Sequence, residues 1–480
     1  MSFDFSTLTK PKLIMRNHRL TIPHFGVKGN LVSSKHIFAL LVLCLVTINL
    51  RAQFSEPDTL AGKHAEIEMD PANTVYENTA AGEFTPGKGF QLVKNDFASL
   101  NLSIYASARW VNQVSGDSTW TDHQGRNLAF DGRNDIYWQR AMIWLTGFLS
   151  TPKLTYMATV WTVTTTQQTL VYGNIKYTFG KRLTVGIGII PNACIRSLQG
   201  PFPFFASTDR TMAEDALRGG FTNGIFATGE AIPKVRYTLG LGNNLSILGV
   251  KAANLTRHFS KSASVSWFPT TGEFGPRGGN GDLEHHEKLA TRFGISYCHS
   301  RENRFNNVGT PSPDNTQVRM SDGLLFFETD AFIQGLTVVE ADFDQTSVDL
   351  GIKYKGFALH TEFYYRTLSK IDAVDDNNLP VPITGPNDVI TDKGYTVQAM
   401  YMIIPRKVCI YGVNSMLIDE FERNPYEFGG GVNLYFTKSR SWRINAQAMH
   451  VVKSAGGGTF GLYNSGQTGT TFTIGTDILL

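Results

Sequence analysis

This sequence of 480 residues has only four cysteines, and it lacks the long apolar runs of a helical membrane protein. One transmembrane helix needs about 20 consecutive apolar residues, whereas the mean hydropathy of the whole chain is −0.14. A protein built from several membrane-spanning helices is therefore excluded. Cys194, Cys298 and Cys409 lie far apart with no CxxC pair, so we expect separate buried thiols, with neither a disulfide framework nor a metal site.

The chain has one apolar stretch, residues 37–48, and it is too short to span a bilayer comfortably. Basic residues precede it and a small residue, Ala52, follows it, which is the arrangement of a secretory signal peptide. We therefore expect residues 1–52 to be an N-terminal extension and signal peptide, with cleavage after Ala52 and translation starting at Met1 or Met15. A single transmembrane anchor is the alternative interpretation of the same stretch.

The charge balance gives no support for a nucleic-acid partner. The whole chain carries 44 bases and 41 acids, a net charge of +3. Residues 1–52 hold seven of the bases and one of the acids, so the mature chain has 37 bases and 40 acids, a net charge of −3. The sequence pI near 8.5 belongs to the precursor, and we expect no nucleic acid to bind.

Apolar and polar residues alternate along most of the chain after residue 100. In residues 100–110, leucine, isoleucine, alanine and tryptophan alternate with asparagine, serine, tyrosine and arginine. Because successive side chains of a strand point to opposite faces, each such run predicts a strand with one apolar and one polar face. The alternation recurs in residues 140–147, 171–179, 182–189, 234–239, 289–297, 347–354, 357–366, 395–403 and 472–480.

Long polar segments separate some of these runs, and short turns rich in glycine or asparagine separate others. The long segments are 112–134, 191–229, 270–286, 300–321, 372–392 and 454–469. Long loops at one rim and short turns at the other are typical of outer-membrane barrels. We therefore predict an all-β fold, a transmembrane antiparallel β-barrel of about 16 strands over residues 90–480. A periplasmic lead-in at 53–89 precedes it, and short helices are expected only near residues 66–69 and 211–217.

Two features favour a membrane barrel over a large soluble β-sandwich. The polar faces carry full charges, which a wide aqueous lumen would hold and a dry sandwich core would not. Aromatic residues fall near the predicted strand ends, as in the girdles at membrane interfaces; they are Trp110, Trp138, Trp144, Trp161, Trp267, Tyr297 and Trp442. We expect the protein in the outer membrane of a Gram-negative cell, in contact with outer-membrane lipid.

Several stretches resemble, in order, strands and loops of the phosphate-selective porin family of Gram-negative outer membranes. They are QRAMIWLTG (139–147), LTVGIGIIP (183–191), TDR (208–210), KGFALHTEFY (355–364), GYTVQA (394–399) and GGVNLYF (430–436). The resemblance covers roughly residues 90–480 and implies a 16-stranded barrel, often a homotrimer, whose basic side chains attract anions into the pore. The chain departs from the pattern at Leu480, where barrels usually end in an aromatic, and it has no dense run of arginines.

The segment 191–229 is expected to fold into the lumen and narrow it, as loops of porins do. Its arginines would meet bases of the wall, and a converging set of cations attracts small anions such as phosphate. The candidate pore-lining, anion-attracting residues are Arg140, Lys176, Arg182, Arg196, Arg210, Arg218, Lys234, Arg236, Arg292, Lys353 and Arg366. Two alternatives remain open. One is an unselective pore for small hydrophilic solutes, in which these bases pair with acids such as Asp209 and only hold the loop. The other is a non-conducting barrel with an adhesion or assembly role.

No metal, cofactor or catalytic site is expected. Glu284–His285–His286–Glu287 contains metal-ligand types, but adjacent positions suit a single ion poorly, and a solvated charged loop is the preferred interpretation. His360 and Glu362 should point inward from one strand. With no nucleophile constellation beside them, we expect a pore-lining pair and no enzyme. The glycine-rich runs lack the Lys–Ser/Thr of a phosphate-binding loop.

Overall fold

The computed structural model describes residues 85–87, 89–130, 132–163, 168–245, 256–304, 318–385, 388–456 and 462–480. The expected signal peptide (1–52), the short helix near 66–69 and almost all of the lead-in (53–89) lie outside the described residues. Those three expectations stay predictions.

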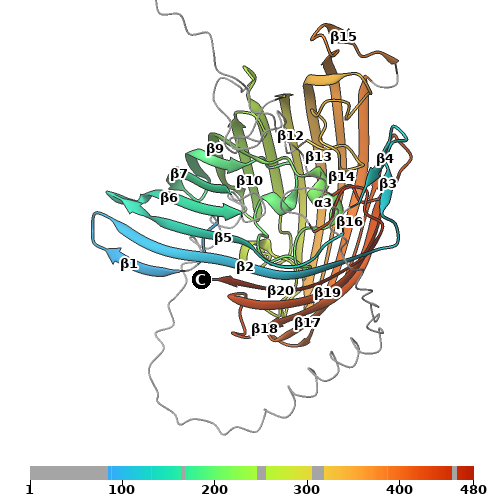
Figure 1. The fold of residues 1–480 in the computed structure, drawn as a ribbon. Coiled ribbons are helices and arrows are strands. Elements are labelled where there is room, and N and C mark those ends of the chain that lie inside the picture. The colour runs from blue at the N-terminus through green and yellow to red at the C-terminus, as the bar shows by residue number, and fades with distance from the viewer. Residues whose placement is uncertain are drawn as a thin grey trace, which may run out of the picture. The chain divides into compact units, whose positions relative to one another are not determined.

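Within the described residues, sixteen long strands form one closed antiparallel ring, which can be followed in Figure 1. Each ring strand pairs with the next along the chain, and β20 pairs with β2 from Tyr105↔Leu479 to Ser115↔Gly469. This last pairing closes the sheet into a barrel, so the predicted fold is confirmed. The ring strands are β2 (Ser99–Ser115), β5 (Asn134–Leu149), β6 (Thr151–Val163), β7 (Gln168–Gly180), β8 (Leu183–Pro191), β9 (Phe221–Ile232), β10 (Val235–Gly242), β11 (Ser260–Trp267), β12 (Ala290–Asn303), β13 (Thr337–Tyr354), β14 (Phe357–Val374), β16 (Val389–Ile404), β17 (Val408–Ile418), β18 (Tyr426–Tyr435), β19 (Trp442–Val452) and β20 (Gly469–Leu479).

The remaining elements are short. Strand β1 (Phe90–Lys94) pairs with the start of β2, and β15 (Pro380–Pro382) pairs with the end of β14. Strands β3 (Thr119–Thr121) and β4 (Asn127–Ala129) form a hairpin of their own. Helix α3 (Met212–Leu217) and the 3₁₀ turns η2 (Arg196–Leu198) and η4 (Pro276–Gly278) complete the set. Among the described residues, no helix has both the length and the apolar composition needed to cross a bilayer.

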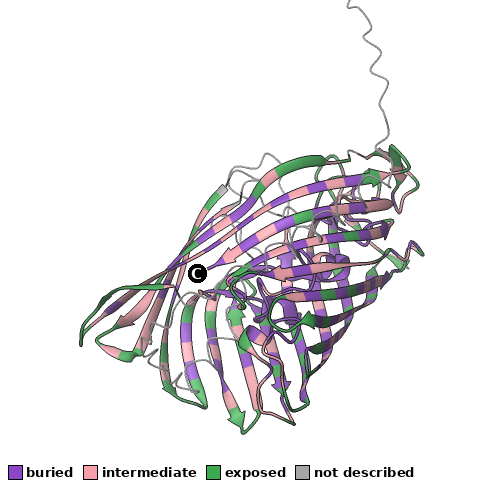
Figure 2. Cartoon of the chain, turned by 90° about the horizontal axis from the view of Figure 1, so that it is seen from below, coloured by how far each residue is buried: buried purple, intermediate pink, exposed green. Residues whose placement is uncertain are grey.

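The two faces of the ring strands differ as the alternation predicts. On β12, Phe293, Ile295 and Tyr297 are 43–53% exposed on the outer face, whereas Arg292 and Ser296 are buried on the inner face. Figure 2 shows the same alternation of buried and less buried residues along the strands. Apolar side chains that face outward all around a closed ring stay out of water only if lipid covers them. The fold is therefore that of a transmembrane β-barrel.

Tight turns at one rim link alternate pairs of strands. The hairpin between β13 and β14 uses Lys355 and Gly356, with φ of 46° and 85°. Two successive positive φ values are what the tightest antiparallel hairpin requires, which explains the glycine. This rim, called the short-turn rim below, also holds the connections at Ser150, Lys181–Arg182, Pro233–Lys234, Pro405–Lys407 and the chain end. The opposite rim is called the long-loop rim below, because most of its connections between ring strands are longer.

One long segment lies at the short-turn rim. The prediction that groups residues 270–286 with the long loops of the other rim is therefore wrong. Residues 268–289, called the rim segment below, join β11 to β12. Because β9 and β10 meet at a tight turn at the short-turn rim, β10 and β11 meet at the other rim, and β11 to β12 returns to the first. The rim segment folds inward, where Phe274, Asn280 and Asp282 are each at most 2% exposed. The predicted solvated charged loop at 284–287 is therefore only partly correct: the Glu287 side chain is 78% exposed, but the segment that carries it packs inside the barrel.

The interior of the barrel is packed. Residues 192–220, called the inward loop below, connect β8 to β9 and carry α3, which lies within the ring in Figure 1. Ile195, Leu198 and Met212 of this loop are completely buried. Trp144 and Trp161, expected in an interfacial girdle, are also fully buried and point inward. Because neighbouring residues of a strand face opposite sides of the sheet, both tryptophans lie on the inner face of their strands. The girdle prediction is therefore wrong for these two residues.

Candidate functional site

Asp209 anchors the inward loop to the barrel wall. Its Oδ2 lies 2.7 Å from Nη2 of Arg109 on β2 and 3.2 Å from Nη2 of Arg140 on β5, and all three residues are at most 4% exposed. Burial by itself would raise the pKa of the Asp209 carboxyl, but the charges of Arg109, Arg140 and Arg210 outweigh it and hold that pKa well below its usual range. The carboxylate is therefore ionised under all ordinary conditions.

Helix α3 begins with a capping box that the sequence carries locally. The Thr211 hydroxyl accepts from the Glu214 backbone N–H, and the Glu214 carboxylate accepts from the Thr211 N–H at 2.9 Å. Glu427 of β18 accepts a further hydrogen bond from the Met212 N–H at 2.6 Å. The helix start is thus tied to the wall strands β16 to β18, which α3 contacts. The predicted short helix near 211–217 is confirmed.

The inward loop and the rim segment meet inside the ring. The Asn280 N–H donates to the Phe204 carbonyl at 2.8 Å, and Arg277 donates to the Phe202 carbonyl at 2.9 Å. Arg196 reaches back to the Asn280 side-chain oxygen at 2.9 Å. Two connections from opposite rims therefore share one interface inside the barrel.

Four arginines surround a cavity beside that interface. Arg196 comes from the inward loop, Arg277 from the rim segment, and Arg236 and Arg292 from the wall strands β10 and β12. The cavity holds about 20 Å³, room for one or two waters, and Phe268 lines it. The Arg236 guanidinium stacks on the Phe268 ring at 4.7 Å. The Arg292 guanidinium lies 5.7 Å from the same ring, so cation–π contacts help to hold these two guanidiniums in place.

Acidic residues balance part of the charge of this arginine cluster: besides Asp349, Glu362 of β14 accepts a hydrogen bond from the Arg196 backbone N–H at 2.8 Å. Asp349 of β13 lies 2.6 Å from Nε of Arg292 and 4.0 Å from Nε of Arg196. Burial lowers the pKa of Arg196, and the neighbouring Arg292 charge lowers it further. His360 lies beside the cluster, 3% exposed and edge-on to Phe274 at 5.4 Å. Neither of its ring nitrogens has a hydrogen-bond partner among the described residues. The site therefore has positive charge and polar groups directed at the same small space.

The cluster opens toward the short-turn rim through a larger cavity of about 1010 Å³. Arg236 and Arg277 line both cavities. The charged residues that line the larger cavity are Arg236, Arg277, Arg406, Lys438, Arg440, Glu273, Glu284 and the ionisable His286. Five side chains with fixed positive charge face two carboxylates there. A solute entering from this rim meets a basic vestibule.

The eleven predicted pore-lining bases occupy three kinds of position. The buried ones inside the barrel are Arg140, Arg196, Arg210, Arg218, Arg292, Lys353 and Arg366. Lys176 and Arg236 are half-buried, and Arg182 and Lys234 are exposed at tight turns. Only Arg196, Arg236 and Arg292 of this set come together at the arginine cluster.

Many of the buried bases are held by local partners. Arg218 pairs with Asp215 at 3.2 Å, Arg366 pairs with Asp392 at 2.6 Å, and Arg210 donates to the Ser197 hydroxyl at 3.1 Å. The wide aqueous lumen expected for these charges is therefore replaced, in the described part of the chain, by a packed interior with internal ion pairs.

Five buried arginines were not among the predicted pore-lining bases: Arg109, Arg277, Arg423, Arg440 and Arg443. Arg109 and Arg443 lie on inner faces of strands, and the alternation of polar and apolar residues along those strands could have identified them. Arg443 pairs with Asp477 at 2.7 Å and donates to the Phe205 carbonyl of the inward loop at 2.8 Å. Arg277 and Arg440 lie in connections, where no periodicity indicates direction.

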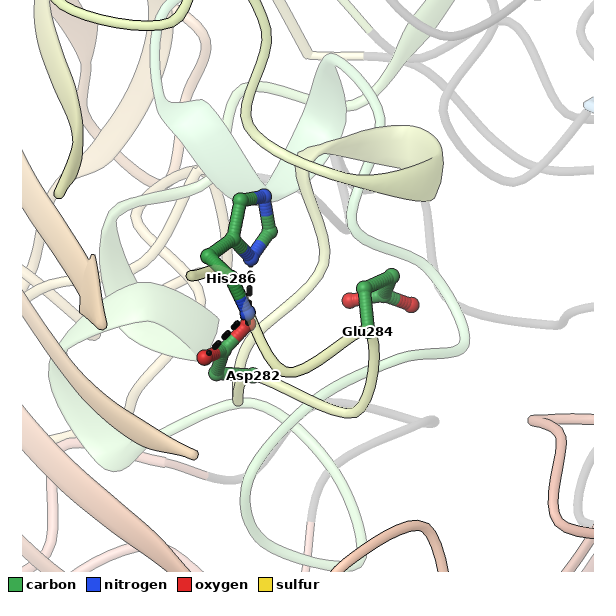
Figure 3. A group of neighbouring side chains, drawn as sticks. All are labelled: Asp282, Glu284 and His286. Carbon is green, nitrogen blue, oxygen red and sulfur yellow. Dashed lines mark hydrogen bonds and ion pairs between the residues drawn. The ribbon is translucent and has the colours of Figure 1, made fainter. Parts of the chain in front are cut away.

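Asp282, Glu284 and His286 form a close group at the base of the rim segment (Figure 3). Their ligand atoms all lie within 4.8 Å of one another. His286 is already hydrogen-bonded through Nδ1 to Asp282 and through Nε2 to Glu273 at 3.0 Å. Burial lowers the pKa of His286, but the hydrogen bonds to Asp282 and Glu273 outweigh it and raise the pKa to about 9.

The charge balance around this group favours internal pairing over a bound cation. Arg440 lies 3.5 Å from Glu284, and the positive charge of Lys353 is also close enough to interact with the Glu284 carboxylate. Asp282 also accepts from the Gly356 N–H at 2.8 Å, which fixes the rim segment to the β13–β14 turn. The protonated imidazole between two carboxylates thus serves as an anchor.

The long-loop rim carries an interlocked set of loops. His123, in the connection from β2 to β5, lies 2.7 Å from Asp322 in the connection from β12 to β13, and its other nitrogen contacts the Phe332 carbonyl at 2.9 Å. Phe326 and Phe327 of the second connection are fully buried. Burial lowers the pKa of His123, but the Asp322 hydrogen bond and charge raise it overall. We call these two connections the loop cap.

Comparisons with known proteins add the following. No protein-family model matches the chain, and no curated protein matches it. Solved structures that align with it include OmpT, an outer membrane protein of Vibrio cholerae (12% identity, 81% of this chain and 99% of that one, TM-score 0.46), and an anion-selective porin from Comamonas acidovorans (10% identity, 80% and 100%, TM-score 0.44). A third is OmpF of Salmonella typhi in complex with daunomycin (10% identity, 82% and 100%, TM-score 0.39). At these identities and scores, the barrel class rests on the strand pairing of the chain itself.

Proposed function

We propose that this protein is an outer-membrane porin that passes small hydrophilic solutes and favours anions. The observation that carries the proposal is the convergence of Arg196, Arg236, Arg277 and Arg292 on one cavity that opens into a basic vestibule. Cations held rigidly in a low-dielectric wall lower the energy of an entering anion and raise its local concentration. Guanidinium groups also match the paired oxygens of phosphate or carboxylate.

The orientation follows from the general architecture of such barrels. Short turns face the periplasm and longer loops face the exterior, so the vestibule would face the periplasm and the loop cap the exterior. The expected signal peptide in residues 1–52 would direct export. Within this proposal, the interface between the inward loop and the rim segment is the narrowest point of the route.

Planar-bilayer recordings test the proposal. The purified barrel should produce step-like conductance. In a potassium chloride gradient, the reversal potential should lie closer to the equilibrium potential of chloride than to that of potassium. Arg236→Gln should shift that potential toward cation preference, because Arg236 lines both cavities. Arg182→Gln is the matched control, since Arg182 is exposed at a tight turn and lines neither cavity. Cation preference in the unmodified protein, or equal shifts in both variants, would contradict anion selectivity.

A second candidate function is a non-conducting barrel with an adhesion or assembly role. The loop cap favours it, because its buried phenylalanines and the His123–Asp322 contact cover one rim. A protein that inserts into bilayers, shifts on gels with heat and remains electrically silent would support this candidate against the porin.

Two finer points belong to the same proposal. The family resemblance suggests phosphate as a preferred anion and a homotrimer as the assembled form. Added phosphate should block chloride current at lower concentration than sulfate if phosphate is preferred. Sedimentation in detergent would separate a trimer from a monomer of the mature chain.

A further inference from the structure

Two cysteines that are remote in sequence lie side by side in the structure. Cys194 is in the inward loop, just after β8, and Cys298 is on the inner face of β12. A β-carbon placed on Gly219 would lie 2.7 Å from Sγ of Cys194 and 3.8 Å from Sγ of Cys298, so both sulfurs lie beside the same glycine. All three described cysteines are buried free thiols, as expected, but Cys194 and Cys298 lie side by side, so the expectation that each thiol is isolated is wrong for this pair.

The surroundings hold the two sulfurs in place. Both cysteines are 0% exposed, as is Leu245, which lies beside them. The Gly219 N–H donates to Sγ of Cys194 at 3.1 Å, so the start and the end of the inward loop meet at this point of the wall. Gly219 has no side chain to separate them, and any larger residue would displace the Cys194 sulfur.

We propose that Cys194 and Cys298 form a disulfide that tethers the base of the inward loop to β12. The inference rests on the proposed export to the cell envelope, where disulfides form and persist. Both S–H bonds break and one S–S bond forms. The two electrons and two protons pass to an oxidised protein disulfide of the envelope, which leaves as a dithiol.

The bond forms during assembly of the barrel. A thiolate must reach the oxidant for exchange to occur, and neither sulfur is exposed in the finished fold. Oxidation therefore precedes or accompanies docking of the inward loop. Cys409, on β17, is equally buried. It is expected to remain a thiol and serves as an internal reference.

The disulfide restrains a large part of the wall. It closes a loop that contains β9, β10, β11 and the rim segment, besides most of the inward loop itself. Cross-links that close long loops remove more freedom from the unfolded chain than those that close short ones. The tether also fixes the inward loop close to Arg196, so the position of the arginine cluster depends on it.

Mass spectrometry of the protein extracted from outer membranes tests the bond directly. Denaturation with iodoacetamide and no reductant should alkylate one cysteine, Cys409, and yield a Cys194–Cys298 cross-linked peptide two hydrogens lighter than the separate thiols. With reductant, all three should be alkylated. Three alkylated cysteines without reductant, or any cross-link that includes Cys409, would overturn the proposal.

Variants provide an independent readout. Cys194→Ser should unfold at lower temperature than the unmodified protein and should not respond to reductant present during heating. Cys409→Ser, the matched control, should keep both the higher unfolding temperature and the response to reductant. Equal behaviour of the two variants would contradict the tether. Free thiols in a conducting barrel would refute the disulfide alone, whereas a disulfide in a silent barrel would refute the porin alone.

Discussion

Replacing Asp209 by asparagine should strongly destabilise the docked state of the inward loop. The substitution keeps the size and shape of the side chain but removes its charge. Arg109 and Arg140 then remain inside the barrel, 3% and 1% exposed, without the carboxylate that lies 2.7 Å and 3.2 Å from their guanidinium groups. Arg140 keeps the Gln139 side-chain oxygen at 3.0 Å, a neutral acceptor that compensates only part of its charge.

The size of the effect follows from this burial. Removing one partner of a buried ion pair costs about 3–5 kcal/mol, because the other charge stays desolvated and uncompensated. Each 1.4 kcal/mol is about a factor of ten in an equilibrium constant. Asp209→Asn should therefore shift the equilibrium between docked and released loop by about two to three and a half orders of magnitude.

Urea unfolding of the barrel in lipid vesicles, followed by fluorescence of the buried Trp144 and Trp161, measures the loss. Asp135→Asn is the matched control: Asp135 pairs with Arg133 at 3.1 Å, but its side chain is 47% exposed. An exposed pair contributes at most about 1 kcal/mol. Equal stabilities of the two variants, or a loss below about 1 kcal/mol for Asp209→Asn, would refute the argument that Asp209 anchors the loop.

The pH dependence gives a second check. The pKa of Asp209 is lowered in the folded protein, so its contribution to stability is present above the pKa of the unfolded chain, near 4. It is lost as the pH falls through the lower folded value. The stability difference between the native protein and Asp209→Asn should thus be constant from about pH 5 to pH 8 and shrink in strong acid.

Three further predictions concern other parts of the barrel. His123→Ala should loosen the loop cap and increase channel noise or conductance. Because the folded pKa of His123 is raised, the cap should also loosen in the native protein as the pH rises above that pKa; an unchanged trace in both tests would contradict this role. Hydrogen exchange of the backbone around His286 should accelerate, beyond its intrinsic pH dependence, as the pH rises through about 9. The reason is that deprotonation of His286 removes the positive charge between Asp282 and Glu273. Uniform acceleration across the rim segment would argue against this anchoring role. Phe363→Arg, at an outward position 59% exposed to lipid, should cost about 2–4 kcal/mol of barrel stability in vesicles, whereas no loss would place this face in water.

Much of the candidate site could be read from local pattern, and the rest could not. Parity placed Arg140, Arg292 and Lys353 on inner faces, and the short helix expected near 211–217 is α3. The rim segment was misplaced, because its polar residues resemble those of any exposed loop. Its partners lie in the inward loop, and the two segments meet only after the ring has closed.

The alternation of residue types by itself determined the barrel class, the number of strands to within a few and, in the runs where it is regular, the face on which each side chain lies. This is because a strand has a period of two and a closed ring has only an inside and an outside. The alternation did not show β9 (Phe221–Ile232), which lies in the segment 191–229 that was expected to be a loop. Only the tertiary structure decided what the inside contains. It brought Cys194 to Cys298, Asp209 to Arg109, and four arginines to one cavity. Contacts across a barrel depend on ring closure and on the path of two connections, and no local period encodes either of them.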